Sequence, residues 1–327
     1  MRRRAFHQLT ESLSTLSPHQ LRQLNESVAR LSQQNEVREM VSDQVQHDGQ
    51  CPHCRTHQFW HWGTTGAGEQ RYRCKSCLKT FTGLTGTALG RLRHKGLLLD
   101  YAACMKNSLS VRETALKLGL HRNVVFRWRH RLMPELTKHQ PQALLGVAEV
   151  DETFFRESFK GRKRGMPRKA HKRGTPAGRR GVSKEQIPVL TAISRGSRSS
   201  HLTVLPGVPT TKAVVAALGP VVTADTVLCS DSAKIYKPAG KALGVTLRQI
   251  PTGMHKLGPY NIQTVNALHG RMKGWFFNFK GVATKNLAVY LAWFRFFDNS
   301  QAGRSPQAFL RDAISLPPAT TVIPSVA

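Results

Sequence analysis

The chain has 327 residues, of which 40% are hydrophobic, and a formal net charge of +30. This length and apolar content indicate folded domains and exclude a disordered polymer. No apolar run approaches the ~20 residues of a membrane span, and the basic start Met1-Arg-Arg-Arg4 is not followed by the apolar stretch of a signal peptide. We therefore expect a cytoplasmic protein without a membrane partner.

The positive charge is unevenly distributed. Residues 1–50 carry six Arg, no Lys and six acidic residues, so they are neutral. The whole surplus lies in residues 51–327. A surplus of this size predicts binding to a polyanion, with nucleic acid as the first candidate.

Residues 1–45 are predicted to form an N-terminal helical segment. Apolar residues recur there at mostly three- and four-residue steps over 10–40, which is typical of an amphipathic helix. This stripe either packs on its own domain or mediates self-association, and the sequence leaves both alternatives open. Its members are Leu13, Leu16, Leu21, Leu24, Val28 and Leu31.

Residues 46–95 are predicted to form a zinc ribbon. Two Cys-x-x-Cys pairs, Cys51/Cys54 and Cys74/Cys77, are separated by nineteen residues. Each pair can form a knuckle, and two knuckles complete a tetrahedral thiolate site for one structural Zn²⁺. Aromatic residues between and just after the pairs supply a small core, and in a reducing cytosol disulfides are disfavoured.

Residues 96–135 have the layout of a helix-turn-helix. A helix over 96–105 precedes a second over 111–118, which Ser110 can cap, and a third over 121–132. The alternative is an ordinary helical hairpin with a solvated basic face. The third helix offers polar side chains to DNA phosphates and base edges: Arg122, Asn123, Arg127, Arg129 and Arg131.

A linker over 136–143 leads to a domain over 144–300 with a different pattern. Three strands (146–155, 187–194, 201–205) come first, and then helices near 210–219 and 232–242 alternate with strands at 226–230 and 245–250. Two helices, 261–278 and 284–298, close the domain. This is the order of an RNase H-like α/β fold, a mixed sheet flanked by helices.

Two segments lack the composition of a core. The insertion 156–184 carries twelve Lys or Arg among repeated Gly and Pro, which predicts a mobile arm. Its position beside Asp151 suggests DNA contact through Arg162, Lys163 and Arg164. Residues 301–327 are predicted to be an irregular C-terminal tail.

Two acids and a helix form the most informative constellation. Asp151 and Asp231 each lie in or after a short β-rich run, and Asn266 and Lys273 are two helical turns apart on one face of the helix over 261–278. Two carboxylates at strand ends, facing an amide and a cation, suit divalent metals that cut and join phosphodiesters. Glu149 shares the strand face of Asp151 and is the next acid to consider, whereas Glu152 points to the other face.

The order of these parts resembles bacterial insertion-sequence transposases of the DDE type, in the zinc-ribbon branch often called ISXO-like. The resemblance spans about residues 45–298. It is carried by Cys51-Pro-x-Cys54, Cys74-x-x-Cys77, Val150-Asp-Glu-Thr153, Ser230-Asp231, Asn261-Ile-Gln-Thr-Val-Asn266, His269, Lys273, Phe279-Lys-Gly-Val-Ala-Thr-Lys-Asn-Leu287 and Tyr290-Leu-Ala-Trp-Phe294.

The resemblance implies a chemistry and partners. Asp151, Asp231 and Asn266 would hold two Mg²⁺ (or Mn²⁺) ions, with Lys273 on a phosphate. The third position departs from the more common Glu, and an amide oxygen is a weaker ligand. The partners would be double-stranded DNA, both element ends and target, and a second copy in a homodimer or larger assembly. The alternatives are an RNase H-like nuclease or resolvase without strand transfer, and a non-enzymatic DNA-binding regulator.

Overall fold

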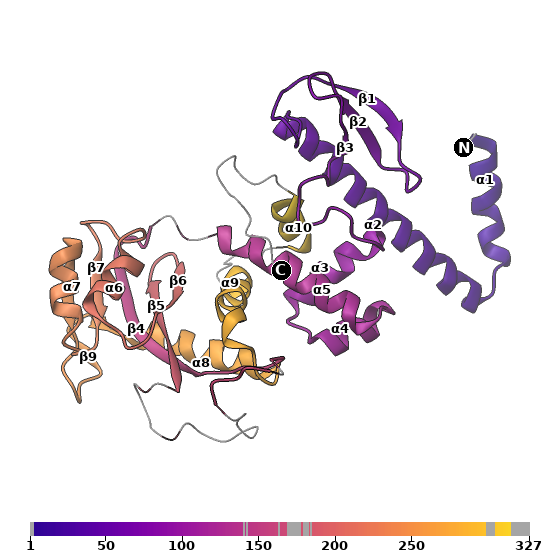
Figure 1. The fold of residues 1–327 in the computed structure, drawn as a ribbon. Helices are drawn as coiled ribbons and strands as arrows, with labels where there is room; N and C mark the ends of the chain where they lie inside the picture. The colour runs from indigo at the N-terminus through magenta and orange to yellow at the C-terminus, as the bar shows by residue number, and fades with distance from the viewer. Residues whose placement is uncertain are drawn as a thin grey trace. The chain divides into compact units, whose positions relative to one another are not determined.

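The computed structural model describes residues 3–139, 141, 143–162, 164–168, 178, 183, 185–298 and 305–314. The chain divides into two compact units (Figure 1). Unit 1 comprises residues 1–107, 111–128 and 305–327, and unit 2 comprises residues 108–110 and 129–304. Within the described ranges, no helix combines the length and apolarity needed to cross a membrane.

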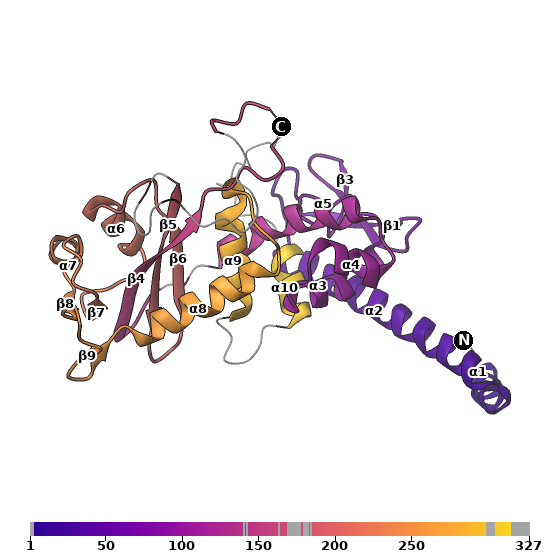
Figure 2. The same cartoon turned by 90° about the horizontal axis from the view of Figure 1, so that it is seen from below.

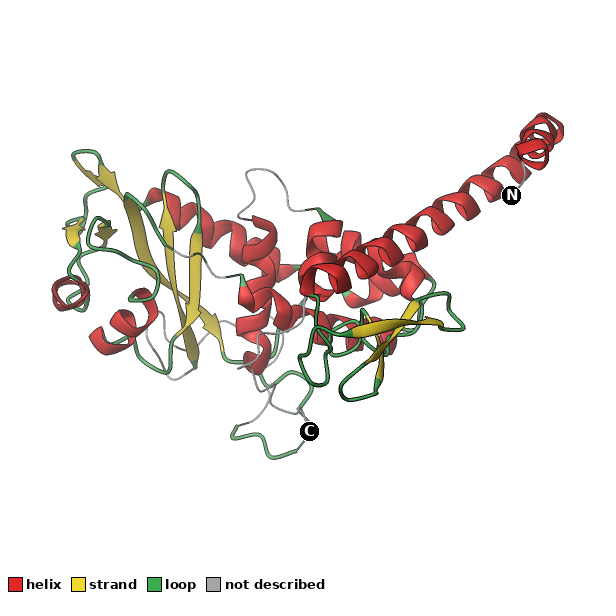
Figure 3. Ribbon diagram, turned by 90° about the horizontal axis from the view of Figure 1, so that it is seen from above, coloured by secondary structure: helices red, strands yellow, loops and turns green. Residues whose placement is uncertain are grey.

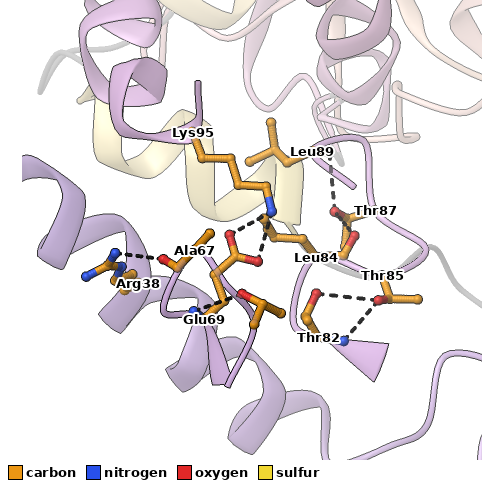
Figure 4. Close-up of polar contacts among 10 residues, drawn as sticks. Arg38, Ala67, Glu69, Thr82, Leu84, Thr85, Thr87, Leu89 and Lys95 are labelled. Carbon is orange, nitrogen blue, oxygen red and sulfur yellow. Dashed lines mark hydrogen bonds and ion pairs between the residues drawn. The ribbon is translucent and has the colours of Figure 1, made fainter. Parts of the chain in front are cut away.

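Unit 1 contains an antiparallel ribbon attached to a long helix. The ribbon strands follow one another in the order β1-β2-β3. The Arg38 guanidinium of the helix α2 donates to the Ala67 carbonyl (2.8 Å), and Lys95 pairs with Glu69 (2.7 Å) beside it (Figure 4). The first bond ties the C-terminal half of α2 to the ribbon, and the second ties the short helix η2 to it. The bounds are α2 Pro18–Asp48, β1 Phe59–Thr64, β2 Gln70–Cys74 and β3 Thr80–Thr82.

The N-terminal half of α2 has a different environment. Ser17 caps the helix in a reciprocal capping box with Gln20, which explains its sharp start. Its buried residues begin only at Val37. The N-terminal arm, defined as residues 3–33, comprises α1 (Arg3–Ser12), η1 (Leu13–Thr15) and the first half of α2, and it projects away from the ribbon and the helices of unit 1 (Figures 2 and 3).

The three helices predicted over 96–132 are present. Tyr101 and Trp128 pack edge to face, with ring centroids 5.2 Å apart. The expected irregular tail over 301–327 is wrong for Pro306–Ile314, which forms a further helix, α10, packed on α3. Its buried Phe309 and Leu310 explain why this segment folds. The bounds are η2 Lys95–Leu97, α3 Leu98–Lys106, α4 Val111–Leu118, α5 Arg122–Leu132 and η3 Met133–Lys138.

Unit 2 is built on a mixed sheet whose described strands lie in the order β6-β5-β4-β7-β8. The pairs β4–β5 and β5–β6 are antiparallel, whereas β4–β7 and β7–β8 are parallel. This order and these directions are those of an RNase H-like sheet, so the predicted fold class is confirmed. The bounds are β4 Val147–Arg156, β5 Gln186–Ser194, β6 Ser200–Val204, β7 Val227–Ser230 and β8 Thr246–Gln249.

Helices cover both faces of this sheet. On one face, Ala148, Val150 and Leu190 pack against α6 and α7. The alternate residues of β4 face α8, which runs across the strands (Figure 2). Because side chains alternate along β4, Ala148 and Val150 point into the apolar core, whereas Glu149 and Asp151 point towards α8. The bounds are α6 Thr211–Leu218, α7 Tyr236–Leu243, β9 Lys256–Leu257, β10 Tyr260–Asn261, α8 Gln263–Phe277, η4 Thr284–Asn286 and α9 Leu287–Asp298.

Candidate functional site

The strand register brings the two predicted aspartates to neighbouring positions. β4 pairs with β7 in parallel, with Val147 opposite Val227 and Glu149 opposite Cys229. The same register, continued by two residues, places Asp151 opposite Asp231, which directly follows β7. Adjacent strands lie about 4.8 Å apart. The two positions are thus neighbours at the centre of the sheet, and the charge of Asp231 acts on Asp151.

The environment of Asp151 disfavours its negative charge. Burial, and then the nearby charge of Asp231, raise the pKa of Asp151 to about 6, although the Glu152 N–H and Lys273 act in the opposite direction. The Glu152 N–H donates to Asp151 Oδ1 at 2.8 Å. One carboxylate oxygen is therefore held by the backbone, and a cation beside the pair would relieve the repulsion.

The loop after β7 fixes Asp231. Its Oδ1 accepts the N–H of Ala233 at 3.0 Å. The side chain of Gln249, at the end of β8, donates to the carbonyls of Asp231 and Ala233, both at 3.1 Å. α7 begins only at Tyr236, so Asp231 closes a turn rather than capping that helix.

Helix α8 directs one stripe of side chains at Asp151. His269 Nδ1 lies 3.8 Å from Asp151 Oδ2, and Lys273, one turn further on, interacts electrostatically with both groups. Asn266 lies three residues before His269, on the same stripe by helical spacing. The side chains of Asn266 and Lys273 are exposed. Within this stripe, His269 contacts Asp151 and Lys273 interacts with it electrostatically, whereas Asn266 is placed there by its helical spacing alone.

His269 is neutral at physiological pH. Burial, with a smaller effect of Lys273, lowers the pKa of its imidazole to about 4, so the contact with Asp151 is not an ion pair. Its Nε2 is buried without a hydrogen-bond partner among the described residues. Carboxylates and a neutral imidazole are oxygen and nitrogen donors of the kind that bind divalent metals, so the residue types of Asp151, Asp231 and His269 fit the ions that the resemblance implies.

Glu149 has a structural role rather than the spare catalytic one considered from the sequence. It is fully buried, and its Oε1 accepts from Arg195 Nε at 2.6 Å. Its Oε2 accepts the N–H of Val265, in the first turn of α8, at 2.9 Å. Arg195 also donates to the carbonyls of Pro259 (2.7 Å) and Asn261 (2.8 Å). This Glu149 clamp ties β4 to the start of the helix that carries Asn266.

Glu152 is the acid that the sequence reasoning passed over. It lies on the α7 face, where Tyr236 Oη donates to its Oε1 at 2.8 Å. Burial raises its pKa to about 7, and the charges of Asp151 and Asp231 add to the increase despite the Tyr236 bond. Glu152 is thus within electrostatic range of both aspartates although it leaves β4 on the opposite face. Its place directly after Asp151 was the available signal.

The four ribbon cysteines form a metal-sized cluster in unit 1. The sulfurs of Cys51 and Cys77 are 3.8 Å apart, those of Cys54 and Cys74 are 3.5 Å apart, and all four lie within 4.8 Å of one another. Zn–S bonds of about 2.3 Å give a tetrahedron with edges of about 3.8 Å. A bond with the Thr56 hydroxyl lowers the pKa of Cys74 to about 5. The cluster therefore fits one structural Zn²⁺.

The residues predicted to contact DNA separate into exposed and buried ones. The prediction that Arg129 contacts DNA is wrong, because only 1% of this residue is exposed. Its guanidinium donates to the Leu109 carbonyl at 2.7 Å and stacks on Trp293 at 4.8 Å, so it is part of the core of unit 2. Lys163 lies outside the described residues. The exposed ones are Arg122, Asn123, Arg127, Arg131, Arg162 and Arg164.

Comparisons with known proteins give weak similarities. No family model matches the chain. A protein of Halobacterium salinarum described as an uncharacterized protein in transposable element ISH50 is 26% identical over 255 residues, covering 75% of this chain and 83% of that protein.

Two solved structures are similar to part of the chain. The magnesium complex of the HTLV-2 integrase catalytic core has a TM-score of 0.28 at 8% identity, covering 51% of this chain and 94% of that chain. The pre-cleavage Mos1 transpososome has a TM-score of 0.24 at 10% identity, covering 67% of this chain and 74% of that chain. Because these superpositions are poor, the fold assignment rests on strand order and direction.

Proposed function

We propose that this chain is a DDE-type DNA transposase with Asn266 at the third position, which cleaves and joins strands at the ends of an insertion sequence. The observation that supports the proposal is the parallel register of β4 and β7, which, continued by two residues, aligns Asp151 with Asp231. The ISXO-like motifs support it, as does a relative whose name places it in a transposable element.

The residues of the site divide the work. Two Mg²⁺ or Mn²⁺ ions, when bound, supply the Lewis acidity that activates the attacking oxygen and stabilises the leaving one. Asp151 and Asp231 are the residues that would hold them, and Asn266 adds a neutral amide oxygen, a weaker ligand than a carboxylate. Lys273 offers a point charge to a phosphate oxygen, and the neutral His269 can accept a proton or orient a water molecule.

DNA recognition is assigned to unit 1 and to the basic insertion. The α5 side chains of Arg122, Asn123 and Arg127 are exposed, as a recognition helix requires. Arg162 and Arg164, at the start of the insertion, are exposed in unit 2. The ribbon would hold Zn²⁺ and orient the helices. Paired element ends require two copies of the chain.

The proposal is tested with purified protein, Mg²⁺ and a labelled duplex that carries the inverted repeats flanking the gene. Wild type should nick the ends and join the freed 3′-OH to a target plasmid. Asp151→Asn and Asp231→Asn should abolish both steps, and Asp225→Asn, an exposed turn residue, should change neither. Mg²⁺ should also raise the Tm of wild type but not of either site variant, which reports metal binding independently of activity.

The same assay separates the alternatives. Cleavage without joining would overturn the transposase assignment in favour of an RNase H-like nuclease. If the protein bound the ends but did not cleave them in Mg²⁺ or Mn²⁺, the result would support a non-enzymatic DNA-binding regulator. Full activity in both site variants would refute the assignment of the aspartates.

A further inference from the structure

The N-terminal arm carries an apolar seam in which three of the four side chains are exposed and the fourth, Leu24, is partly buried. Its residues are spaced by three, four and three positions, which is the a/d pattern of two consecutive heptads. Leu21, Val28 and Leu31 are 41%, 50% and 59% exposed. The arm seam is defined by Leu21 and Val28 at a positions and Leu24 and Leu31 at d positions.

We propose that the arm seam is a homotypic interface: two copies of this chain pair their α2 arms, seam against seam, in a parallel two-stranded coiled coil. This inference does not rest on the proposed activity. It assigns a surface and a partner, whereas the reaction alone requires only that two copies meet.

The charges around the seam favour a second copy over other occupants. The positions flanking the seam, e and g, are all uncharged, in a chain whose net charge is +30. Elsewhere two copies would repel each other, because residues 51–327 hold the whole surplus, but residues 1–50 are neutral. DNA would find no cations along this face. The flanking residues are Gln20, Asn25, Ser27, Ser32 and Gln34.

The sequence of the seam also indicates its geometry. Leu at d with a β-branched residue at a favours two parallel strands, and here Val28 stands at a. The next a position is Asn35, whose side chain is exposed. A single Asn at an a position sets register and oligomer state in parallel dimers. The seam ends there, because Arg38 at the following d position bonds the ribbon.

The length of the seam determines how it acts. Two heptads are short for an independent coiled coil, since helices of fewer than ~12–15 residues are marginal alone. In this chain α2 is already a continuous helix of 31 residues, and its C-terminal half contributes buried residues to unit 1. The arm is therefore preorganised, which lowers the entropic cost of pairing.

Sedimentation of the full zinc-loaded chain tests the interface. Wild type should be a dimer at micromolar concentration. Leu24→Ala with Leu31→Ala should raise the dimer dissociation constant by more than about a hundred-fold. Both changes keep helix propensity, and circular dichroism should be unchanged. Gln23→Ala with Arg30→Ala, on the outer face of the same helix, is the matched control and should remain dimeric.

A cysteine scan tests the parallel arrangement. Leu24→Cys places like residues opposite each other at a d position, so mild oxidation should trap a covalent dimer. Glu26→Cys, on the outer face, should not crosslink above the wild-type level. A monomeric wild type, a dimer that survives the seam double variant, or a Leu24→Cys chain that crosslinks no more than Glu26→Cys would each overturn the proposal.

Discussion

The Glu149 clamp should contribute to both the stability of unit 2 and the cleavage rate. In Glu149→Gln the side chain keeps its size and can still accept the Val265 N–H, but it loses its charge opposite Arg195. Breaking a buried ion pair from one side costs about 3–5 kcal/mol. Arg195 is 25% exposed, so water partly solvates the remaining guanidinium, and we expect the free energy of unfolding to fall by about 3 kcal/mol.

The same substitution should impair catalysis through α8. The clamp holds the helix start next to Asn266, so its loss should lower the cleavage rate while end binding, which we assign to unit 1, is unchanged. Urea unfolding and single-turnover cleavage measure the two effects. The matched control is Glu157→Gln, which removes an ion pair with Arg168 at 3.5 Å in which both side chains are about a quarter exposed, and it should cost less than Glu149→Gln because water reaches both partners. Equal stability and equal cleavage rates for Glu149→Gln and wild type would refute the role of the clamp.

Three further predictions concern the pH dependence, the ribbon and the recognition helix. The folded-state pKa of Asp151 is raised from 3.8 to about 6. The protonated carboxyl therefore favours the folded state at low pH. This contribution to the free energy of unfolding is lost as the pH rises through 6, where the buried carboxyl ionises. Asp151→Asn should therefore make the metal-free chain about 2 kcal/mol more stable at pH 7, but not at pH 4, in urea unfolding, and equal pH profiles would contradict this. Cys74→Ser should release zinc, detected with a chromogenic chelator, and lower the Tm of unit 1; a retained stoichiometric ion would argue against the ribbon site. Arg122→Ala with Arg127→Ala should reduce the slope of log K against log salt for end binding by about 2, and an unchanged slope would remove α5 from the interface.

Local sequence pattern predicts the elements well because their periods are strong. The alternation over 147–156 correctly assigns Glu149 and Asp151 to one face of β4. The partner of Glu149 could not be predicted. Arg195 is 46 residues away in the sequence, and only the pairing of β4 with β5 brings the two side chains together. Likewise, the register that aligns Asp151 with Asp231 is a property of the sheet and leaves no local signal.

The sequence predicts poorly which of several chemically similar side chains is exposed and which is buried. Arg127 and Arg129 have the same chemistry on the same helix, yet only Arg129 meets Trp293, more than 150 residues away. The apolar stripe of the arm was visible in the sequence, but the sequence did not show whether it packs on its own domain. In the structure the buried residues of α2 begin only at Val37, beyond the stripe. The helix α10 did have a signal, with Phe309 and Ala313 spaced by one turn.

Anomalous diffraction from crystals grown with Mn²⁺ would locate the metal ions of the Asp151–Asp231 site. We expect two peaks about 3.5–4 Å apart, bounded by the carboxylates of Asp151 and Asp231, with neither peak present in crystals of Asp231→Asn. Mn²⁺ peaks elsewhere in the chain, or full occupancy in that variant, would contradict it.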